Sequence, residues 1–357
     1  MQFKPIKYME WFKTKSKVKI DLCSSGVESL KWKDLDMMRE DLEISGDNSY
    51  GYSPLLRTIA ERYGVSEDNV VSTIGTSQAI FLVCAALVEP GDEVLVETPV
   101  YEPLLAVPEA FQARVVRLTR RYEDDYQFSL EIFKRFLTPR TKCVLLTNLH
   151  NPSGALLSRS FLEQVVQIAR ARDISVVMDE IYLEFLDEEP TAFHLADNVI
   201  VISSLTKVFG LGDIRCGWVL AEPELAKSMR RIIDYINVEG VFLGEEIAYL
   251  AFGRLDEIKR KNRKWINQNR SMLRDFISQE KALSWVEPAE GVVCFPRLET
   301  PLINGDILAE LLRRKHDTAV VPGSFFEQPQ HFRMGFGVSP DTLAAGLENI
   351  RKVLREF

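Results

Sequence analysis

The apolar residues of this chain form short continuous runs that alternate with segments of helical periodicity. Runs rich in valine, isoleucine and leucine predict buried strands at 70–74, 93–97, 143–147, 175–178, 199–202 and 218–220. Apolar residues at helical spacing predict helices over 55–63, 76–88 and 158–172. Apolar strands that alternate with helices are typical of a mostly parallel sheet covered on both faces. We therefore expect an α/β fold built on such a sheet.

The pattern changes after Pro223. A stripe of apolar residues predicts a long helix, and a smaller α+β unit follows it. The long helix is expected at 255–276, strands at 292–295 and 332–336, and further helices at 305–316 and 341–357. The lysine-rich start is expected to be an amphipathic arm with solvated lysines. We predict the arm and part of a small domain in 1–44, a large domain in 45–246 and a small C-terminal domain in 247–357.

Composition excludes several classes of protein. A formal charge of -8 over 357 residues gives no electrostatic basis for binding nucleic acid. The N-terminus has no apolar signal segment, and no apolar run approaches the length needed to cross a bilayer. The five cysteines lie far apart, mostly in apolar segments, and are expected to be reduced, buried and free of metal. We expect a soluble cytoplasmic protein without a metal site.

Polar residues follow several of the predicted strands. Ligands of parallel sheets bind beyond the carboxyl ends of the strands, where Thr76, Asn151, Asp179 and Lys207 are expected to lie. A lysine at such a position can form a Schiff base with an aldehyde when its amine is partly desolvated. Taken alone, Lys207 could equally be a solvated surface lysine. The convergence of these strand ends favours the chemical role.

A phosphate site is predicted on both sides of Lys207. Ser204 and Arg215 offer a hydroxyl and a planar guanidinium, which suit a phosphate dianion. Thr76 and Ser77 are expected to cap a helix whose N-terminal amides would also bind phosphate. An aldehyde and a phosphate on one small molecule describe pyridoxal 5′-phosphate.

This cofactor makes further demands that the chain can meet. Its ring nitrogen needs a carboxylate partner, and Asp179 is the candidate, although a strand-end aspartate can also simply cap a loop. Asn151 and Tyr182 could bind the 3′-oxygen of the ring, and Tyr101 could stack on its face. Arg333 lies within a predicted strand, where a charge requires a reason, and could clamp a substrate carboxylate through two hydrogen bonds.

The order of these motifs resembles that of fold-type I pyridoxal-phosphate enzymes of the class I/II aminotransferase family, over nearly the whole chain. Each motif is weak alone, but their joint order and spacing are specific. The motifs are Thr73-x-Gly75-Thr76-Ser77-Gln78-Ala79, Pro90-Gly91-Asp92, Pro99-x-Tyr101, Asn148-x-x-Asn151-Pro152-Ser153-Gly154, Asp179-Glu180-x-Tyr182, Ser204-x-x-Lys207, Arg215-x-Gly217, Pro322-Gly323 and Arg333.

The resemblance implies an aminotransferase that moves the amino group of an α-amino acid to a 2-oxo acid. Lys207 would carry the internal aldimine and transfer the proton, and Asp179 would assist as the second catalytic residue. The cofactor-binding set would be Thr76, Ser77, Tyr101, Asn151, Asp179, Tyr182, Ser204, Lys207 and Arg215, in the large domain. Gly26, Asn151 and Arg333 would bind substrate. A homodimer with a shared active site is implied, in which Tyr50 or Tyr52 is lent to the partner's phosphate.

Three departures from the family pattern bear on specificity. Asp213 stands where a small residue, asparagine or arginine is usual, and Cys216 where an aliphatic residue is usual. The segment 237–241 replaces a stretch that is often rich in serine and threonine. Other reactions on the same scaffold remain alternatives: a β-lyase, a decarboxylase or a biosynthetic cyclase or synthase. A ligand-sensing domain without catalysis is a more remote one.

Overall fold

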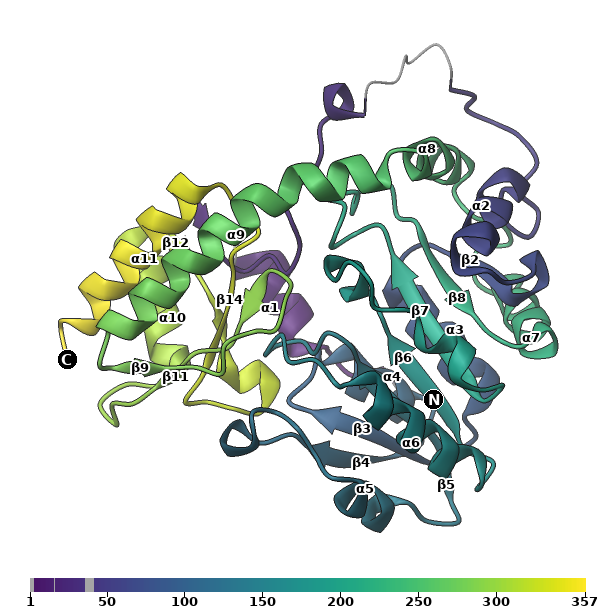
Figure 1. Cartoon of the computed structure of the whole chain (residues 1–357), viewed down its shortest axis with the longest axis horizontal. Coiled ribbons are helices and arrows are strands. Elements are labelled where there is room, and N and C mark those ends of the chain that lie inside the picture. Colours follow the sequence, from purple (N-terminus) through teal and green to yellow (C-terminus); the bar gives the residue numbers. More distant parts are fainter. Residues whose placement is uncertain (1–2, 16, 36–41) are drawn as a thin grey trace.

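A seven-stranded sheet is the centre of the computed structural model, which describes residues 3–15, 17–35 and 42–357 (Figure 1). Parts of the predicted segment 1–44 therefore lie outside the described residues. The strands, in their order across the sheet, are β2 (Val70–Thr73), β8 (Gly217–Leu220), β7 (Val199–Ser204), β6 (Ser175–Asp179), β5 (Thr141–Thr147), β3 (Glu93–Thr98) and β4 (Arg114–Thr119).

Most neighbouring strands of this sheet run parallel, as the sequence predicts. The exception is β8, which is antiparallel to both β7 and β2. Ser204 at the end of β7 is the direct partner of Gly217 at the start of β8. The loop between these two residues carries Lys207. Its two ends lie side by side at the same edge of the sheet, and strand pairing fixes both of them.

Helices cover both faces of the sheet. Alternate side chains of each strand point to opposite faces, so Val94 and Val96 pack in one apolar cluster and Leu95 in another. The first cluster is covered by α3 (Thr76–Leu87), α4 (Pro103–Ala110) and α7 (Pro223–Ile233). The second is covered by α2 (Ser53–Tyr63), α5 (Leu130–Phe136), α6 (Arg159–Arg170) and α8 (Phe242–Phe252). The α/β fold with a doubly covered sheet is confirmed.

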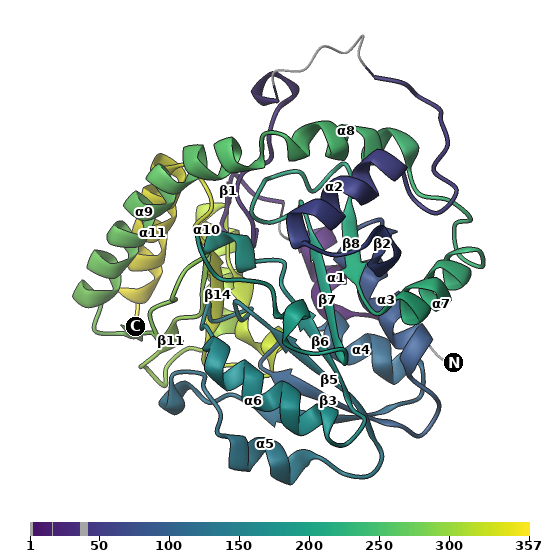
Figure 2. The same cartoon turned by 45° about the vertical axis from the view of Figure 1, so that its right-hand side comes forward.

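The C-terminal part carries three small sheets beside the long helix α9 (Leu255–Gln279). In Figures 1 and 2, α9 continues the arch of α8 toward α11. The sheets pair β1 (Ile20–Asp21) with β12 (Thr318–Ala319), β9 (Leu283–Ser284) with β11 (Arg297–Leu298), and β14 (Phe332–Gly335) with both β10 (Val293–Cys294) and β13 (Val321–Pro322). The helices of this part are α10 (Gly305–His316) and α11 (Pro340–Leu354). The pairing of β1 with β12 joins the N-terminal segment to the C-terminal part of the chain.

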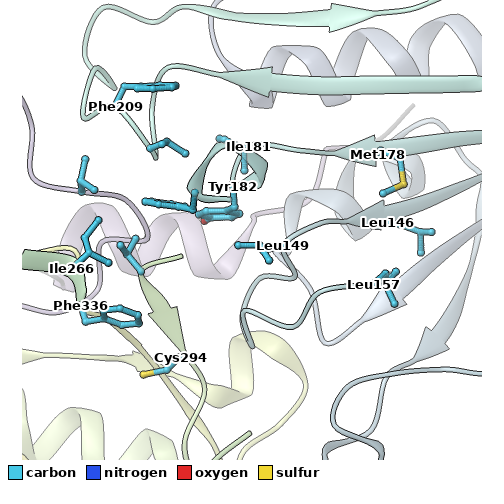
Figure 3. Close-up of a cluster of buried hydrophobic side chains, with 14 of the residues drawn as sticks. Leu146, Leu149, Leu157, Met178, Ile181, Tyr182, Phe209, Ile266, Cys294 and Phe336 are labelled. Carbon is cyan, nitrogen blue, oxygen red and sulfur yellow. The ribbon is translucent and has the colours of Figure 1, made fainter. Parts of the chain in front are cut away.

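One apolar cluster continues from the large sheet into the C-terminal part. Figure 3 shows Tyr182 and Leu149 close to one another, with Ile266, Cys294 and Phe336 from the C-terminal elements nearby. All five side chains are buried. A shared core of this kind fixes the small sheets against the carboxyl edge of the large one. Among the described helices, none is both long and apolar enough to cross a membrane.

Candidate active site

A cavity of about 340 Å³ lies at the carboxyl ends of the parallel strands. Most of the predicted cofactor residues line it: Thr76, Ser77, Tyr101, Asn151, Asp179, Tyr182, Lys207 and Arg215. The remaining lining residues are Tyr8, Met9, Phe12, Cys23, Ser24, Ser25, Thr147, Ile181 and Thr206. Segments far apart in the sequence therefore contribute to one cavity.

Lys207 lies in the loop between β7 and β8 and lines this cavity. Its backbone carbonyl accepts a hydrogen bond of 2.9 Å from the Val27 amide. Desolvation, with smaller contributions from the positive charges of Arg333 and Arg215, lowers the pKa of the Lys207 amine to about 8. A substantial fraction of the amine is therefore neutral near pH 8 and able to act as a nucleophile or base.

Asp179 ends β6 and is buried at the floor of the cavity. One oxygen of its carboxylate accepts a hydrogen bond of 3.1 Å from the Ile181 amide. Burial, aided by the negative charge of Glu97, raises the pKa of Asp179 to about 7, although Lys207 opposes the shift. A cationic group placed against Asp179 would offset the unfavourable burial of its negative charge. A protonated pyridine nitrogen is such a group.

The charge of Glu97 is itself balanced by a buried ion pair. Glu97, near the end of β3, receives a hydrogen bond of 2.8 Å from Arg120, and both side chains are fully buried. Its second oxygen accepts from the amide and the hydroxyl of Thr147, the residue paired in register with Asp179. This pair therefore supports the strand edge from which Asp179 projects. Its removal would leave an uncompensated buried charge.

Thr76 and Ser77 are not the caps of the following helix, contrary to the sequence prediction. The N-cap of α3 is Gly75, with a φ of 97°, and no side chain caps the helix. A Cβ atom at Gly75 would lie only 2.5 Å from Nη2 of Arg215. Because the cap is a glycine, the side chains of Thr76 and Ser77 are free to line the cavity. Helix amides, two hydroxyls and a guanidinium thus meet at one point, which suits a phosphate.

Arg215 reaches this turn from the other end of the Lys207 loop. Its guanidinium donates to the carbonyl oxygens of Ile74 (2.8 Å) and Gly212 (3.0 Å). Asp213, which departs from the family pattern, is exposed to solvent. The predicted phosphate ligand Ser204 is buried and accepts a hydrogen bond of 3.2 Å from the Thr206 amide, and it is not among the lining residues.

Asn151 connects the ring region of the cavity with Arg333. The amide oxygen of Asn151 accepts a hydrogen bond of 3.1 Å from Nη1 of Arg333. The amide NH₂ of Asn151 can therefore donate toward a ring oxygen, the role predicted from the sequence. Tyr182, which is buried, lines the cavity and is placed to assist, and Tyr101 lines it as well. Burial raises the pKa of both tyrosines, so both hydroxyls keep their protons at neutral pH.

Arg333 lies in β14, is fully buried and is not among the described residues that line the cavity. Besides Asn151, its guanidinium contacts the Tyr8 hydroxyl (2.9 Å) and the carbonyl oxygen of Cys23 (2.8 Å). The sequence predicted the arginine but not Tyr8. The predicted substrate residue Gly26 packs directly on Lys207, because a Cβ atom there would lie 3.0 Å from the Lys207 Cα.

The N-terminal helix α1 (Lys7–Lys15) forms one wall of the cavity through Tyr8, Met9 and Phe12. The sequence indicated an amphipathic arm, but nothing local tied Tyr8 to Arg333 at the other end of the chain. Phe326 packs over the Arg333 guanidinium at 5.3 Å and is not among the described residues that line the cavity.

The cavity fits pyridoxal phosphate on its own chemistry. A partly desolvated lysine, a buried carboxylate of raised pKa and a glycine-capped helix with an adjacent guanidinium lie around one space. These are the partners that the aldehyde, the ring nitrogen and the phosphate require.

Comparisons with known proteins agree with this assignment. The model of the family "Aminotransferase class I and II" matches residues 27–350. The chain is 28% identical to capreomycidine synthase of Streptomyces vinaceus, over 94% of this chain and 90% of that protein. It is 26% identical to an arginine–pyruvate transaminase of Pseudomonas aeruginosa, over 89% of this chain and 83% of that one. A pyridoxal-phosphate-dependent aminotransferase structure from Streptococcus suis covers 100% of this chain and 99% of its own, with a TM-score of 0.94 and 28% identity.

The family match spans most of the chain, and it agrees with a cavity whose donors suit pyridoxal phosphate. The protein is an enzyme that uses this cofactor to transfer amino groups. The chain belongs to the class I and II aminotransferase family.

Proposed function

We propose that the enzyme moves the amino group of an α-amino acid to a 2-oxo acid, with Lys207 and Asp179 as its catalytic residues. The observation that carries the proposal is the meeting in one cavity of an amine of lowered pKa and a buried carboxylate of raised pKa. When bound, pyridoxal phosphate supplies an electron sink that weakens the bonds to the substrate Cα. Lys207 would remove the Cα proton and return it to the carbon that carried the aldehyde. Asp179 would hold the proton on the ring nitrogen.

The other residues of the cavity position the two ligands. We assign phosphate binding to Thr76, Ser77 and Arg215, and ring binding to Tyr101, Asn151 and Tyr182. Ser204 does not line the cavity, but its hydroxyl accepts from the Thr206 amide and keeps its own proton to donate, so we assign it to the phosphate as well. Arg333, with the Gly26 backbone nearby, holds the substrate carboxylate and so orients the Cα–H bond toward Lys207. Asp179 is the one carboxylate among the described lining residues, and the ring nitrogen of the cofactor would pair with it. A substrate with a neutral side chain therefore fits better than a cationic one.

A half-reaction tests the proposal. Stoichiometric holoenzyme, mixed with single amino acids and no 2-oxo acid, should lose its yellow absorbance with one or a few neutral amino acids. Addition of the matching 2-oxo acid should restore the absorbance, because the reaction is reversible. Arg333→Ala should weaken this half-reaction about 10- to 150-fold, as expected for losing hydrogen bonds to a charged group.

Arg117→Ala is the matched control for Arg333→Ala. Arg117 also makes a bidentate contact with a carboxylate, that of Glu327, but it lies outside the cavity wall. This variant should react as the unmodified enzyme does. Release of ammonia or carbon dioxide with the yellow absorbance intact would contradict transamination and support a lyase or a decarboxylase.

A second candidate function is formation of a ring from an amino acid. The similarity to the solved structure of a pyridoxal-phosphate-dependent cyclase favours it, because that structure covers 100% of this chain with a TM-score of 0.91 and 27% identity. Ring closure would leave the nitrogen in the product and the yellow absorbance unchanged after turnover. Mass spectrometry of the product, together with the spectrum, therefore separates this function from amino transfer.

We also propose a homodimer with a shared active site, in which Tyr50 is the residue lent to the partner's phosphate. Tyr50 is 58% exposed. Tyr52 packs instead against Phe242 and Tyr249 of its own chain, with ring centroids 5.3 and 5.9 Å apart. Tyr50 is therefore the freer of the two to reach another chain.

We also propose a cytoplasmic location. Five buried cysteines without disulfide partners support a reducing compartment.

Mixed dimers test the shared site. Tyr50→Phe should lower the affinity for pyridoxal phosphate about 10- to 150-fold, because it removes a hydrogen bond to a charged group. Mixing this chain with inactive Lys207→Ala should restore activity at limiting cofactor, since the Lys207→Ala chain still supplies Tyr50. Tyr52→Phe is the control and should retain normal cofactor affinity. A fully active monomer, or loss of cofactor affinity in Tyr52→Phe alone, would contradict the proposal.

A further inference from the structure

Helix α1 is fixed to the rim of the cavity by a carboxylate from outside the helix. The amides of Lys7 and Tyr8 donate hydrogen bonds of 3.1 and 2.6 Å to the two oxygens of Glu102. First-turn amides have no partner within their own helix, and a negative charge there also complements the helix dipole. Glu102 directly follows Tyr101, which lines the cavity. The position of α1 is therefore tied to the wall of the site.

Tyr8 is held in one place by its neighbours. The residue is 5% exposed, and its ring meets that of Tyr101 edge to face with centroids 5.7 Å apart. Phe325 packs against a second edge at 5.9 Å, and the Arg333 guanidinium lies 5.5 Å from the ring centroid. The hydroxyl of Tyr8 consequently points at Arg333 while the side chain still lines the cavity.

The hydrogen bonds of Arg333 limit how it can bind a carboxylate. Both N–H groups of Nη2 are engaged, one by the Tyr8 hydroxyl and one by the Cys23 carbonyl oxygen. Nη1 donates to Asn151, and Nε is buried without a partner in the described structure. Two parallel hydrogen bonds to a carboxylate require Nη2 together with Nη1 or Nε. Arg333 therefore cannot form such a fork while both partners of Nη2 stay in place.

We propose that Tyr8 is a carboxylate-positioning residue, which forms a composite binding site with Arg333 for the substrate carboxylate. This inference rests on the proposed function, since it takes the ligand to be an α-amino acid. The Tyr8 hydroxyl accepts a hydrogen bond from Arg333, so its own proton is left to donate to a carboxylate oxygen. Arg333 supplies the positive charge and one hydrogen-bond donor to the carboxylate. The Tyr8 hydroxyl, on the helix α1 that Glu102 fixes, supplies the other donor.

Tyr8→Phe tests the inference, because it removes the hydroxyl and keeps the ring. Calorimetry on the holoenzyme would compare 3-phenylpropionate with 2-phenylethanol, which has the same ring but neither a carboxylate nor an amine that could react with the cofactor. The variant should bind the carboxylate about 10- to 100-fold more weakly and the alcohol unchanged, because only the carboxylate loses a hydrogen bond to a charged group. In turnover, KM for the amino acid should rise while kcat changes little.

Tyr122→Phe is the matched control. The Tyr122 hydroxyl donates a hydrogen bond of 2.8 Å to Ser284, away from the residues that line the cavity. This variant should bind both probes as the unmodified enzyme does. Glu102→Ala provides a second route to Tyr8, because it releases the first turn of α1. It should weaken carboxylate binding as Tyr8→Phe does, whereas Glu102→Gln, which keeps one acceptor oxygen, should have a smaller effect.

Several results would overturn the inference. Equal affinity of Tyr8→Phe and the unmodified enzyme for 3-phenylpropionate shows that Tyr8 does not help to bind a carboxylate. Equal loss for the acid and the alcohol assigns Tyr8 a purely structural role. A Tyr8-dependent preference for the carboxylate in an enzyme that fails to transaminate would instead support the inference and overturn only the proposed reaction.

Discussion

Replacement of Lys207 by alanine is expected to lower turnover by about 10⁴-fold or more. The change removes a positioned base, for which losses of about 10²- to 10⁴-fold are typical, and also the covalent anchor of the cofactor. Lys207 is the one lysine among the described residues that line the cavity, so no neighbouring amine there can replace it. Steady-state rates, measured at saturating cofactor, separate this loss from poorer cofactor retention.

Lys227→Ala is the control for this experiment. Lys227 is an exposed lysine of α7, a helix that packs on the sheet outside the cavity. The control should keep its activity and its yellow absorbance. Lys207→Arg should remain inactive, because guanidinium keeps the charge but stays protonated. Substantial turnover in either Lys207 variant would remove this residue from its catalytic role.

Asp179→Asn is expected to lower kcat about 10²- to 10³-fold, the range for losing one preorganised electrostatic contact. An amide cannot balance the charge of a protonated ring nitrogen, so the electron sink is weakened.

Asp179→Asn should also stabilise the cofactor-free protein against unfolding at alkaline pH. The folded-state pKa of Asp179 is about 7, above the usual 3.8. Its contribution to stability is therefore present at low pH and lost as the pH rises through 7.

Thermal unfolding at two pH values tests this second effect. At pH 8 the cofactor-free Asp179→Asn protein should melt at a higher temperature than the unmodified protein, and the difference should shrink toward pH 4. Asp275→Asn, which changes an exposed aspartate of α9, should leave both unfolding and kcat unchanged. If Asp179→Asn lowers the melting temperature at pH 8, the ionised Asp179 carboxylate does not destabilise the folded protein, contrary to what its raised pKa indicates.

The strands and helices of the large sheet could be predicted because their patterns are local. The run Val199–Ser204 is apolar until its final serines and is buried throughout. By contrast, β4 (Arg114–Thr119) was not predicted. It pairs only with β3 at the edge of the sheet, and most of its side chains are partly or fully exposed. Such a strand carries little apolar periodicity, since it is covered less completely than the central strands.

The capping error at Thr76 and Ser77 has a similar origin. Both residue types favour the N-cap position in general. Here Gly75 adopts a φ of 97° and takes that position, where Arg215 leaves no room for a Cβ atom. The preference of a residue for a cap is local, whereas the side chain that closes in on Gly75 comes from another part of the chain.

The sequence by itself determined six of the seven strands of the large sheet and the polar residues at their ends. It could do so because Asp179 ends an apolar strand, and Lys207 and Asn151 each follow one within a few residues. Only the tertiary structure decided that β8 returns antiparallel to β7 and that Tyr8 contacts Arg333, 325 positions away. Contacts of this kind depend on how the C-terminal sheets and α1 pack on the large sheet. A local sequence pattern cannot predict such packing, because the two residues in contact lie in different elements that are far apart along the chain.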